Sequence, residues 1–208
     1  MEHIASIGMA AALAWASGIR LYAVLFILGL VGHFHLFGWS LPKYLEVLGH
    51  PMVMGATGLL LFLEFFADKI PGLDSVWDAV HTFIRIPAGA LLAAGVIGAD
   101  DGNAWALVAA LLGGTVTAGT HFLKSGSRVA INTSPEPVSN VVASVAEDAA
   151  VMGGLWLAFT HPLVFLGFFI LFVLIAIWLI PKIWRFIKFV VQRIVNFVSG
   201  EMPPARPA

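Results

Sequence analysis

The sequence predicts an all-α protein that crosses a membrane about six times as a polytopic helix bundle. Hydrophobic residues make up 60% of the chain and charged residues 11%, against about 25% charged residues in an ordinary soluble domain. The mean hydropathy is +0.94, and the apolar residues gather in runs near the roughly 20 residues that span the hydrocarbon as a helix. The 208 residues suit one bundle, and the lack of cysteine excludes disulfides and thiolate metal sites.

Six apolar runs are candidate spans, at residues 4–31, 52–67, 87–99, 104–123, 138–159 and 162–180. No Lys or Arg precedes the first run, which continues past a signal-peptidase-like Ala-Trp-Ala at residues 14–16, so we expect a retained helix. The third run is short, Gly-Ile-Arg at residues 18–20 interrupts the first, and Gly113 and Gly114 adjoin in the fourth. These features predict some kinked, broken or partly re-entrant helices.

Lysine and arginine residues are distributed unevenly between the two sides of this bundle. One side has only Lys43, and the other has Lys69, Arg85, Lys124, Arg128, Lys182, Arg185, Lys188, Arg193 and Arg206. Because cytoplasmic loops carry an excess of Lys and Arg, we expect both termini in the cytoplasm. The loop at residues 33–50 and the acidic turn at residues 100–103 then lie outside.

Six spans would give the two halves opposite orientations, which is the arrangement of an inverted repeat. The Ser-Gly-Ile-Arg of residues 17–20 and the Ser-Gly-Ser-Arg of residues 125–128 form a short echo that favours it. A parallel relation competes, because Lys69 and Lys124 each close a span on the cytoplasmic side and each precede a loop that contains proline.

A first group of polar residues lies at residues 72–85, which are amphipathic at helical period. The charged face carries Asp74, Asp78, His81 and Arg85. One interpretation is an interfacial helix whose charged side lies in water. In the other, the charged face turns inward toward Glu64 and Asp68, one turn apart at the end of the second span, and binds a hard cation or relays a proton.

A second group runs from the fourth span into the fifth. Its members are His121, Lys124, Arg128, Asn132, Ser144, Glu147 and Asp148. The carboxylates of Glu147 and Asp148 need cationic partners inside the fifth span, and Arg20 needs an acidic partner or water inside the first. Two interpretations stay open: a salt-bridge network that fixes helix packing, or a transport site.

The two groups together give the candidate residues for binding an ion or substrate. They are Arg20, Glu64, Asp68, Lys69, Asp74, Asp78, His81, Arg85, His121, Lys124, Arg128, Asn132, Ser144, Glu147 and Asp148.

The bundle at residues 1–180 is followed by a basic segment at residues 181–200. We expect this segment to form an amphipathic juxtamembrane helix that binds anionic lipid headgroups, and residues 201–208 to be a disordered tail. Small residues at four-residue spacing, such as Ala90, Ala94 and Gly98, permit close helix contact within the bundle or across a homodimer. Nothing in the sequence indicates a nucleic-acid partner.

The stretch Glu-Phe-Phe-Ala-Asp-Lys-Ile-Pro-Gly-Leu-Asp-Ser-Val-Trp-Asp at residues 64–78, with Arg-Ile-Pro-Ala-Gly at residues 85–89, resembles a family of small bacterial integral membrane proteins. The family is catalogued as a domain of unknown function, number 4126. Residues 17–20, 121–137 and 144–148 are similar to its other signature stretches, and the resemblance covers about residues 16–162. It implies a bacterial inner membrane protein whose family pattern includes the polar positions above, and it implies no activity.

We expect a small transporter or channel for an ion or a small polar solute rather than an enzyme, and we assign no catalytic residue or cofactor. The pathway would be a charged, cytoplasm-facing cavity between the first and fifth spans, because the buried charges outnumber those of one tight ion pair. One alternative is a metal-assisted enzyme acting on lipid headgroups, with Asp74, Asp78 and His81 around a divalent cation. The other is a non-catalytic scaffold whose charges hold the bundle together.

Overall fold

The computed structural model describes residues 2–98, 104–133 and 138–199, and within these ranges it contains helices and no strand. In order they are α1 (Glu2–Phe34), the short 3-10 helices η1 (Leu36–Gly38) and η2 (Lys43–Gly49), α2 (Pro51–Ala67), α3 (Leu73–Ile97), α4 (Ala104–Asn132), α5 (Val138–Thr160) and α6 (Pro162–Ser199). The predicted all-α bundle is confirmed. The expected turn at residues 100–103, the loop at residues 134–137 and the tail at residues 201–208 lie outside the described residues.

Five of the described helices, α1 and α3 to α6, are long and apolar enough to cross a membrane. A sixth span is obtained if η2 and α2, which meet at 70°, are taken as one broken span. The composition and length of the helices therefore fit a membrane protein with about six hydrophobic segments.

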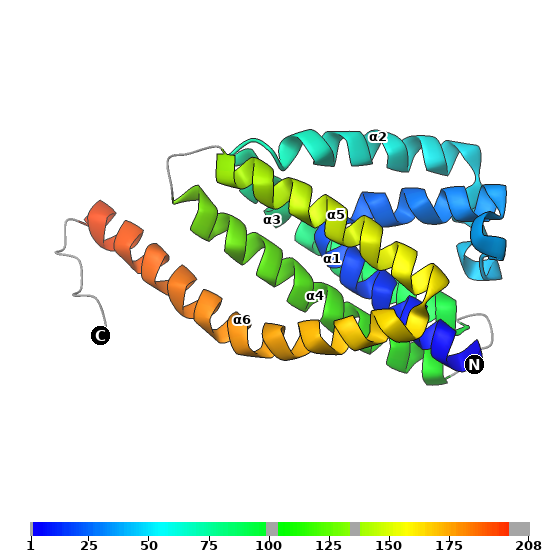
Figure 1. The fold of residues 1–208 in the computed structure, drawn as a ribbon. Coiled ribbons are helices and arrows are strands. Elements are labelled where there is room, and N and C mark those ends of the chain that lie inside the picture. Colours follow the sequence, from blue (N-terminus) through cyan, green and yellow to red (C-terminus); the bar gives the residue numbers. More distant parts are fainter. Residues whose placement is uncertain (1, 99–103, 134–137, 200–208) are drawn as a thin grey trace.

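The helix α1 is broken at Arg20, where φ is −141° and ψ is 75°. The first arm (residues 2–19) lies among α3, α4 and α5, and the second arm (residues 21–34) runs beside α2 (Figure 1). Both arms reach the corner between α5 and α6. A Cβ atom on Gly8 would lie 3.2 Å from Cβ of Pro162, and the ring of Phe37, just past α1, stacks on Phe159 with 5.4 Å between centroids.

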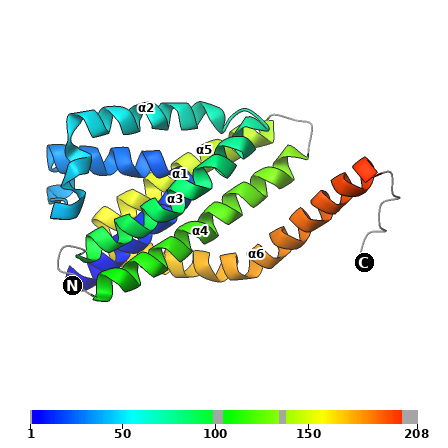
Figure 2. The same ribbon diagram turned by 180° about the vertical axis from the view of Figure 1, so that it is seen from behind.

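The first apolar run is therefore a V with Arg20 at its tip rather than one straight helix over residues 4–31. A broken helix was predicted at Gly-Ile-Arg, and the break lies there. The start of α1 and the end of α6 lie at opposite ends of the bundle (Figures 1 and 2). The side of the membrane on which each terminus lies stays a prediction.

The helix α3 joins two segments that the sequence suggested were separate, the amphipathic residues 72–85 and the short span at residues 87–99, and Pro87 lies inside it. Its charged face points into the bundle, since Asp74, Asp78 and Arg85 are each 0% exposed. Its apolar face points outward, and Phe83 is 83% exposed. The interfacial interpretation is therefore wrong. In lipid the apolar face is the solvated one, so the polar face is buried against other helices.

Small residues bring α3 and α4 close together. A Cβ atom on Gly113 would lie 3.2 Å from the carbonyl oxygen of Gly89, so the two backbones approach to a distance that larger residues would prevent. The hydroxyl of Thr117 in α4 donates to the carbonyl of Ala14 in α1 at 2.8 Å. In this region the small residues join helices of the same chain.

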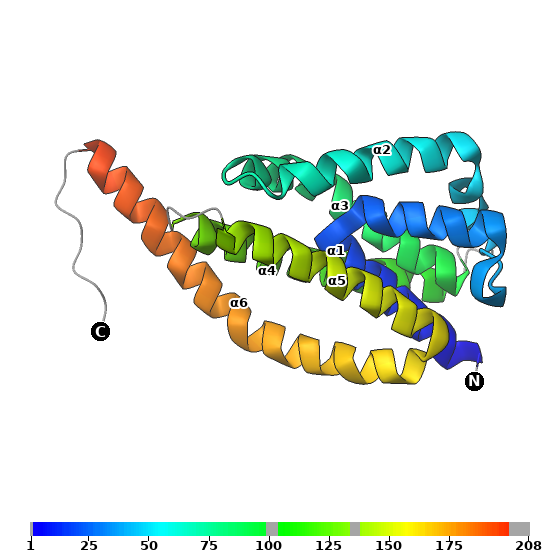
Figure 3. The same cartoon turned by 45° about the horizontal axis from the view of Figure 1, so that its top comes forward.

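The centre of the bundle is α1, and its periphery is α6. In the most apolar stretch of each helix, 67% of the α1 residues are buried, against 11% for α6. The 38 residues of α6 continue through Pro181 without interruption and extend about 57 Å at 1.5 Å per residue. That length exceeds the roughly 30 Å hydrocarbon core, and the basic end of α6 projects past the other helices (Figure 3).

Candidate functional site

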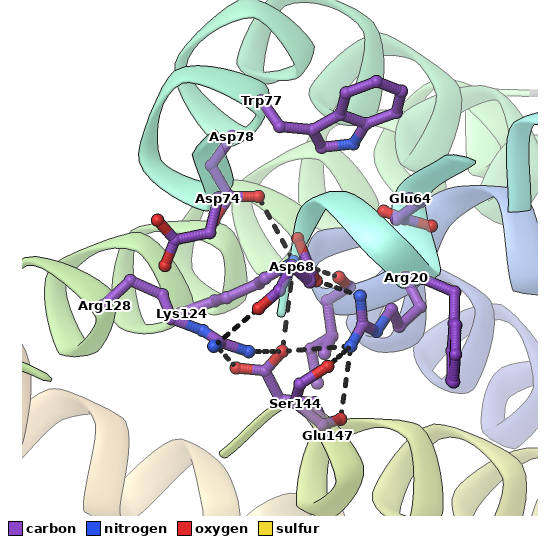
Figure 4. Close-up of polar contacts among 12 residues, drawn as sticks. Arg20, Glu64, Asp68, Asp74, Trp77, Asp78, Lys124, Arg128, Ser144 and Glu147 are labelled. Carbon is purple, nitrogen blue, oxygen red and sulfur yellow. Dashed lines mark hydrogen bonds and ion pairs between the residues drawn. The ribbon is translucent and has the colours of Figure 1, made fainter. Parts of the chain in front are cut away.

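A buried group of charged side chains lies at the tip of α1, where α1, α2, α3, α4 and α5 meet (Figure 4). We call it the charged cluster, and it consists of Arg20, Glu64, Asp68, Asp78, Arg85, Lys124, Arg128, Glu147 and Asp148. The first seven are at most 5% exposed. The Glu147 and Asp148 side chains are 17% and 31% exposed, and they form the accessible edge.

Arg20 joins the tip of α1 to α2 and α5. One terminal nitrogen, Nη1, is ion-paired with Asp68. The other, Nη2, donates to the hydroxyl of Ser144 at 2.9 Å and lies 3.6 Å from Glu147. The Nε atom lies 2.8 Å from Asp148. The guanidinium therefore has acidic partners on two sides, which offsets its removal from water.

Lys124, from α4, lies between two buried carboxylates. Its Nζ atom is 2.8 Å from Oδ2 of Asp68 and 3.2 Å from Oδ1 of Asp78. It also donates to the backbone carbonyl of Ile19 at 3.1 Å. This carbonyl lies next to the break, where the first arm of α1 ends and its last carbonyls have no intrahelical partner.

Arg85 forms the deepest part of the charged cluster, halfway along α3. It pairs with Glu64 at 2.6 Å and with Asp78 at 3.1 Å. Its Nη1 also donates to the carbonyls of Gly18 and Ile19 at 3.3 and 3.2 Å. Two cations, Arg85 and Lys124, thus face the negative end of the first arm, an arrangement that the helix dipole favours.

Arg128 connects α4 with α5. It makes a two-point contact with Glu147, with Nε to Oε1 at 3.2 Å and Nη2 to Oε2 at 2.8 Å. Its Nη1 donates to the side chain and to the carbonyl of Asn140, the latter at 3.0 Å, and to the carbonyl of Asp68 at 3.2 Å. Such a planar, bidentate contact is specific to arginine.

Three carboxylate oxygen atoms of the charged cluster have neither a hydrogen bond nor an ion-pair contact among the described residues. They are Oε2 of Glu64, Oδ1 of Asp68 and Oδ2 of Asp78, all in fully buried side chains. A buried carboxylate oxygen without a partner is costly. These three atoms are therefore the places at which a proton, a water molecule or a small cation would be bound.

Lys69 lies at the accessible edge, next to the buried side chain of Ser144. The Nζ atom of Lys69 is 3.3 Å from Oγ of Ser144 and 3.8 Å from Asp148, and it lies 3.1 Å from the centroid of the Phe65 ring. Partial burial lowers the pKa of Lys69 from its usual value, and the neighbouring Asp148 acts against this shift. With Lys69, the five cations here match the five carboxylates in number.

The remaining candidate residues lie around the charged cluster rather than in it. Asp74 accepts hydrogen bonds from Asn132 at 2.9 Å and from the backbone of Ser75 at 2.6 Å, so it fixes the start of α3. His81 stacks on Trp77 with 4.1 Å between centroids. His121 links Thr82, at 2.7 Å, to Arg85, at 3.3 Å.

Asp74, Asp78 and His81 do not converge, as the metal-assisted enzyme would require. Asp78 faces Arg85 and Lys124, and His81 bonds to the Trp77 carbonyl at 2.7 Å. Over the described ranges, no group of three or more His, Asp or Glu side chains is arranged to hold a metal ion. The backbone carbonyls of Gly18 and Ile19 belong to the charged cluster's surroundings but were not predicted from the sequence, where the Gly-Ile-Arg interruption was the available signal.

The charges between the first and fifth helices contact one another directly instead of lining the expected open cavity. Arg20 touches Ser144 and Asp148 without an intervening gap. A pocket of about 300 Å³ lies farther along α1 and α5 toward α6, and its lining, which includes Trp15, Gly154 and Phe169, is apolar. At Arg20, the side chains of the first and fifth helices are therefore packed directly against each other.

Comparison with known proteins agrees with the resemblance noted in the sequence. The family model described as Domain of unknown function (DUF4126) matches residues 7–182, which include the whole charged cluster and leave most of the basic end of α6 outside. No curated protein and no solved structure matches the chain. Because the match covers most of its length, the chain belongs to the family described as Domain of unknown function (DUF4126).

Proposed function

We propose that this protein translocates a small cation, the proton included, across the bacterial inner membrane through the charged cluster, and that the structure represents a closed state. The observation that carries the proposal is the re-entrant α1, which ends a helix arm inside the bundle among buried charges. In many transporters, interrupted helices of this kind place helix ends and free carbonyls at the ion site.

The cost of the charged cluster favours translocation over a purely structural role. Each charged residue at mid-membrane depth costs about 2.5 to 3.5 kcal/mol on insertion scales. Replacing a buried ion pair by apolar residues of similar volume is often neutral or stabilising. A scaffold could therefore pack the same helices with apolar residues, whereas an ion pathway needs the charges.

The geometry favours a small ion over a larger polar solute. Contacts of 2.6 to 3.2 Å link Lys124, Asp78, Arg85 and Glu64, and Arg20 extends this series to Asp148 at the accessible edge. The unpaired oxygens of Glu64, Asp68 and Asp78 lie along the same series. Carboxylates in such a series can pass a proton or bind a small cation in turn.

The proposed orientation follows from the basic residues. Lys69 and the basic end of α6 lie at one end of the bundle, and Lys43 lies in η2 at the other. By the excess of positive charge in cytoplasmic segments, the accessible edge faces the cytoplasm, and the start of α1 lies outside. The end of α6, with Lys182, Arg185 and Lys188, meets anionic headgroups.

The test is cation flux into liposomes that contain the purified protein. Under an imposed gradient and membrane voltage, the wild-type protein should carry protons, Na⁺ or K⁺ at rates above those of empty liposomes. Asp148→Asn should abolish the flux, and Lys43→Gln, an exposed change outside the charged cluster, should preserve it. Asp148 is suited to this test because its partial exposure leaves folding least affected.

Absence of flux for all three ions under every gradient would contradict the proposal and would leave the scaffold interpretation. Equal flux by wild type and Asp148→Asn would also contradict it, because the pathway would then lie elsewhere. Arg20→Gln is the second variant, and it should abolish flux in protein that still elutes as a single folded species.

A further inference from the structure

We infer that the ammonium group of Lys124 occupies a binding site for a monovalent cation, so that Lys124 acts as a tethered competitor of the ion. The inference rests on the proposed cation translocation for its role in the protein, but the site itself is argued from geometry alone.

Oxygen atoms from three different segments lie closest to the Lys124 ammonium. They are the Ile19 carbonyl at 3.1 Å, Oδ2 of Asp68 at 2.8 Å and Oδ1 of Asp78 at 3.2 Å, and Oε2 of Glu147 lies farther away, at 3.9 Å. Carboxylate and backbone carbonyl oxygens are the ligands that hard metal cations take in proteins. The donor set around Nζ is thus that of a cation site.

The break in α1 supplies a ligand that a continuous helix would not offer. The carbonyl of Ile19 belongs to the last turn of the first arm, where carbonyl groups lack intrahelical partners. The partial negative charge at a helix C-terminus adds to that of the two carboxylates. A cation at the position of Nζ therefore has both formal and partial negative charge around it.

The site offers more acceptors than the ammonium uses. Lysine has three N–H donors; two hydrogen bonds go to the Ile19 carbonyl and to Oδ2 of Asp68, and Oδ1 of Asp78 is an ion-pair contact at 3.2 Å. The second oxygens of both carboxylates, Oδ1 of Asp68 and Oδ2 of Asp78, are buried and have no hydrogen-bond partner. An ion with a larger coordination number than an ammonium would use these two atoms as well.

Charge balance identifies the ion as monovalent. The five cations and five carboxylates of the charged cluster and Lys69 are equal in number. If Lys124 withdraws on its flexible four-carbon stem, a single negative charge is left uncompensated. One Na⁺, K⁺ or ammonium ion restores neutrality, whereas a divalent ion leaves an excess positive charge in a buried site.

The experiment compares two replacements of Lys124 that remove the same charge. Lys124→Ala empties the space of the side chain, and Lys124→Met fills it with a stem of similar length. The unfolding temperature of each is measured in detergent with choline chloride as the reference salt, then with NaCl, KCl or methylammonium chloride at equal ionic strength. Lys124→Ala should show a saturable rise with at least one of these ions, and Lys124→Met and the wild type should not.

A similar response of both variants would contradict the inference, because general screening does not depend on free space. No response of folded Lys124→Ala to any of the ions would also contradict it. If Lys124→Ala does not fold in any salt, Lys124→Ser is measured instead, since it also removes the charge and empties the space of the stem. Stabilisation of Lys124→Ser by one of the ions would support the site, and failure of both variants to fold or to respond in any of the ions would overturn it.

This readout separates the inference from the proposed function. Cation-dependent stability of Lys124→Ala without any flux by the wild type would keep the site and remove translocation. Flux by the wild type with no cation effect on Lys124→Ala would keep translocation and remove the tethered competitor.

Discussion

Replacing Arg85 by methionine removes the cation at the deepest part of the charged cluster while keeping most of its volume. Arg85 is 0% exposed and pairs with Glu64 at 2.6 Å and with Asp78 at 3.1 Å. Asp78 keeps a second cationic partner in Lys124. Glu64 has no other ion pair among the described residues, so its carboxylate is left buried and uncompensated.

Breaking a buried ion pair by removing one partner costs about 3 to 5 kcal/mol. We therefore expect Arg85→Met to lower the free energy of unfolding by that amount, roughly a 140-fold to 3700-fold change in the folding equilibrium at about 1.4 kcal/mol per factor of ten. In Glu64→Gln/Arg85→Met the orphaned charge is absent. The double variant should recover about 2 kcal/mol relative to the single variant, because an uncharged amide is less costly to bury than a carboxylate.

The assay is reversible unfolding in mixed micelles, followed by tryptophan fluorescence or circular dichroism. Lys43→Met serves as the control, since Lys43 is exposed and lies outside the charged cluster. A loss below about 1 kcal/mol for Arg85→Met, the range of exposed salt bridges, would refute the reasoning. A double variant no more stable than the single variant would refute it too.

Two further changes test the packing of α1 and the basic end of α6. Gly18→Ala should lower the unfolding free energy by about 1 to 3 kcal/mol, because the added Cβ would lie 2.6 Å from the backbone oxygen of Thr117. The control is Gly119→Ala, whose added Cβ would have no neighbouring atom within 4 Å. A loss equal to that of Gly119→Ala would contradict the close contact of α1 with α4. Anionic lipid added to neutral micelles should stabilise the protein and raise its unfolding temperature. Changing Lys182, Arg185 and Lys188 together to glutamine should reduce this stabilisation by about 1 kcal/mol of unfolding free energy per residue. An unchanged stabilisation by anionic lipid would contradict headgroup binding.

The sequence predicted the class of the fold and most of the charged cluster, because both follow from local properties. Apolar runs define membrane helices by their length, and charged residues within such runs need one another. Arg20, Asp68 and Lys124 are therefore candidates from the sequence alone, and Asp68 contacts both cations. The residues of the family resemblance include the same positions.

The orientation of the amphipathic residues 72–85 was not decided by the sequence. Periodicity identifies two faces of a helix but not which face is outside, since water and lipid solvate opposite faces. The sequence also did not predict that the second arm of α1 folds back beside the bundle after the break at Arg20. The Gly-Ile-Arg interruption indicated a break, but its direction depends on Lys124 and Arg85, which bind the carbonyls at the break from α4 and α3.

The pathway depends on α1 turning back at Arg20, and the side of the membrane on which α1 begins tests this most directly. The chain lacks cysteine, so single cysteines at exposed His3, Tyr44 and Ser199 report their own positions. An impermeant thiol reagent added outside intact cells should label His3→Cys and Tyr44→Cys, and it should reach Ser199→Cys only after the membrane is permeabilised. If His3→Cys is instead labelled under the same conditions as Ser199→Cys, and Tyr44→Cys is labelled under the other condition, then α1 crosses the membrane. That result would contradict the V-shaped helix and the site built at its tip.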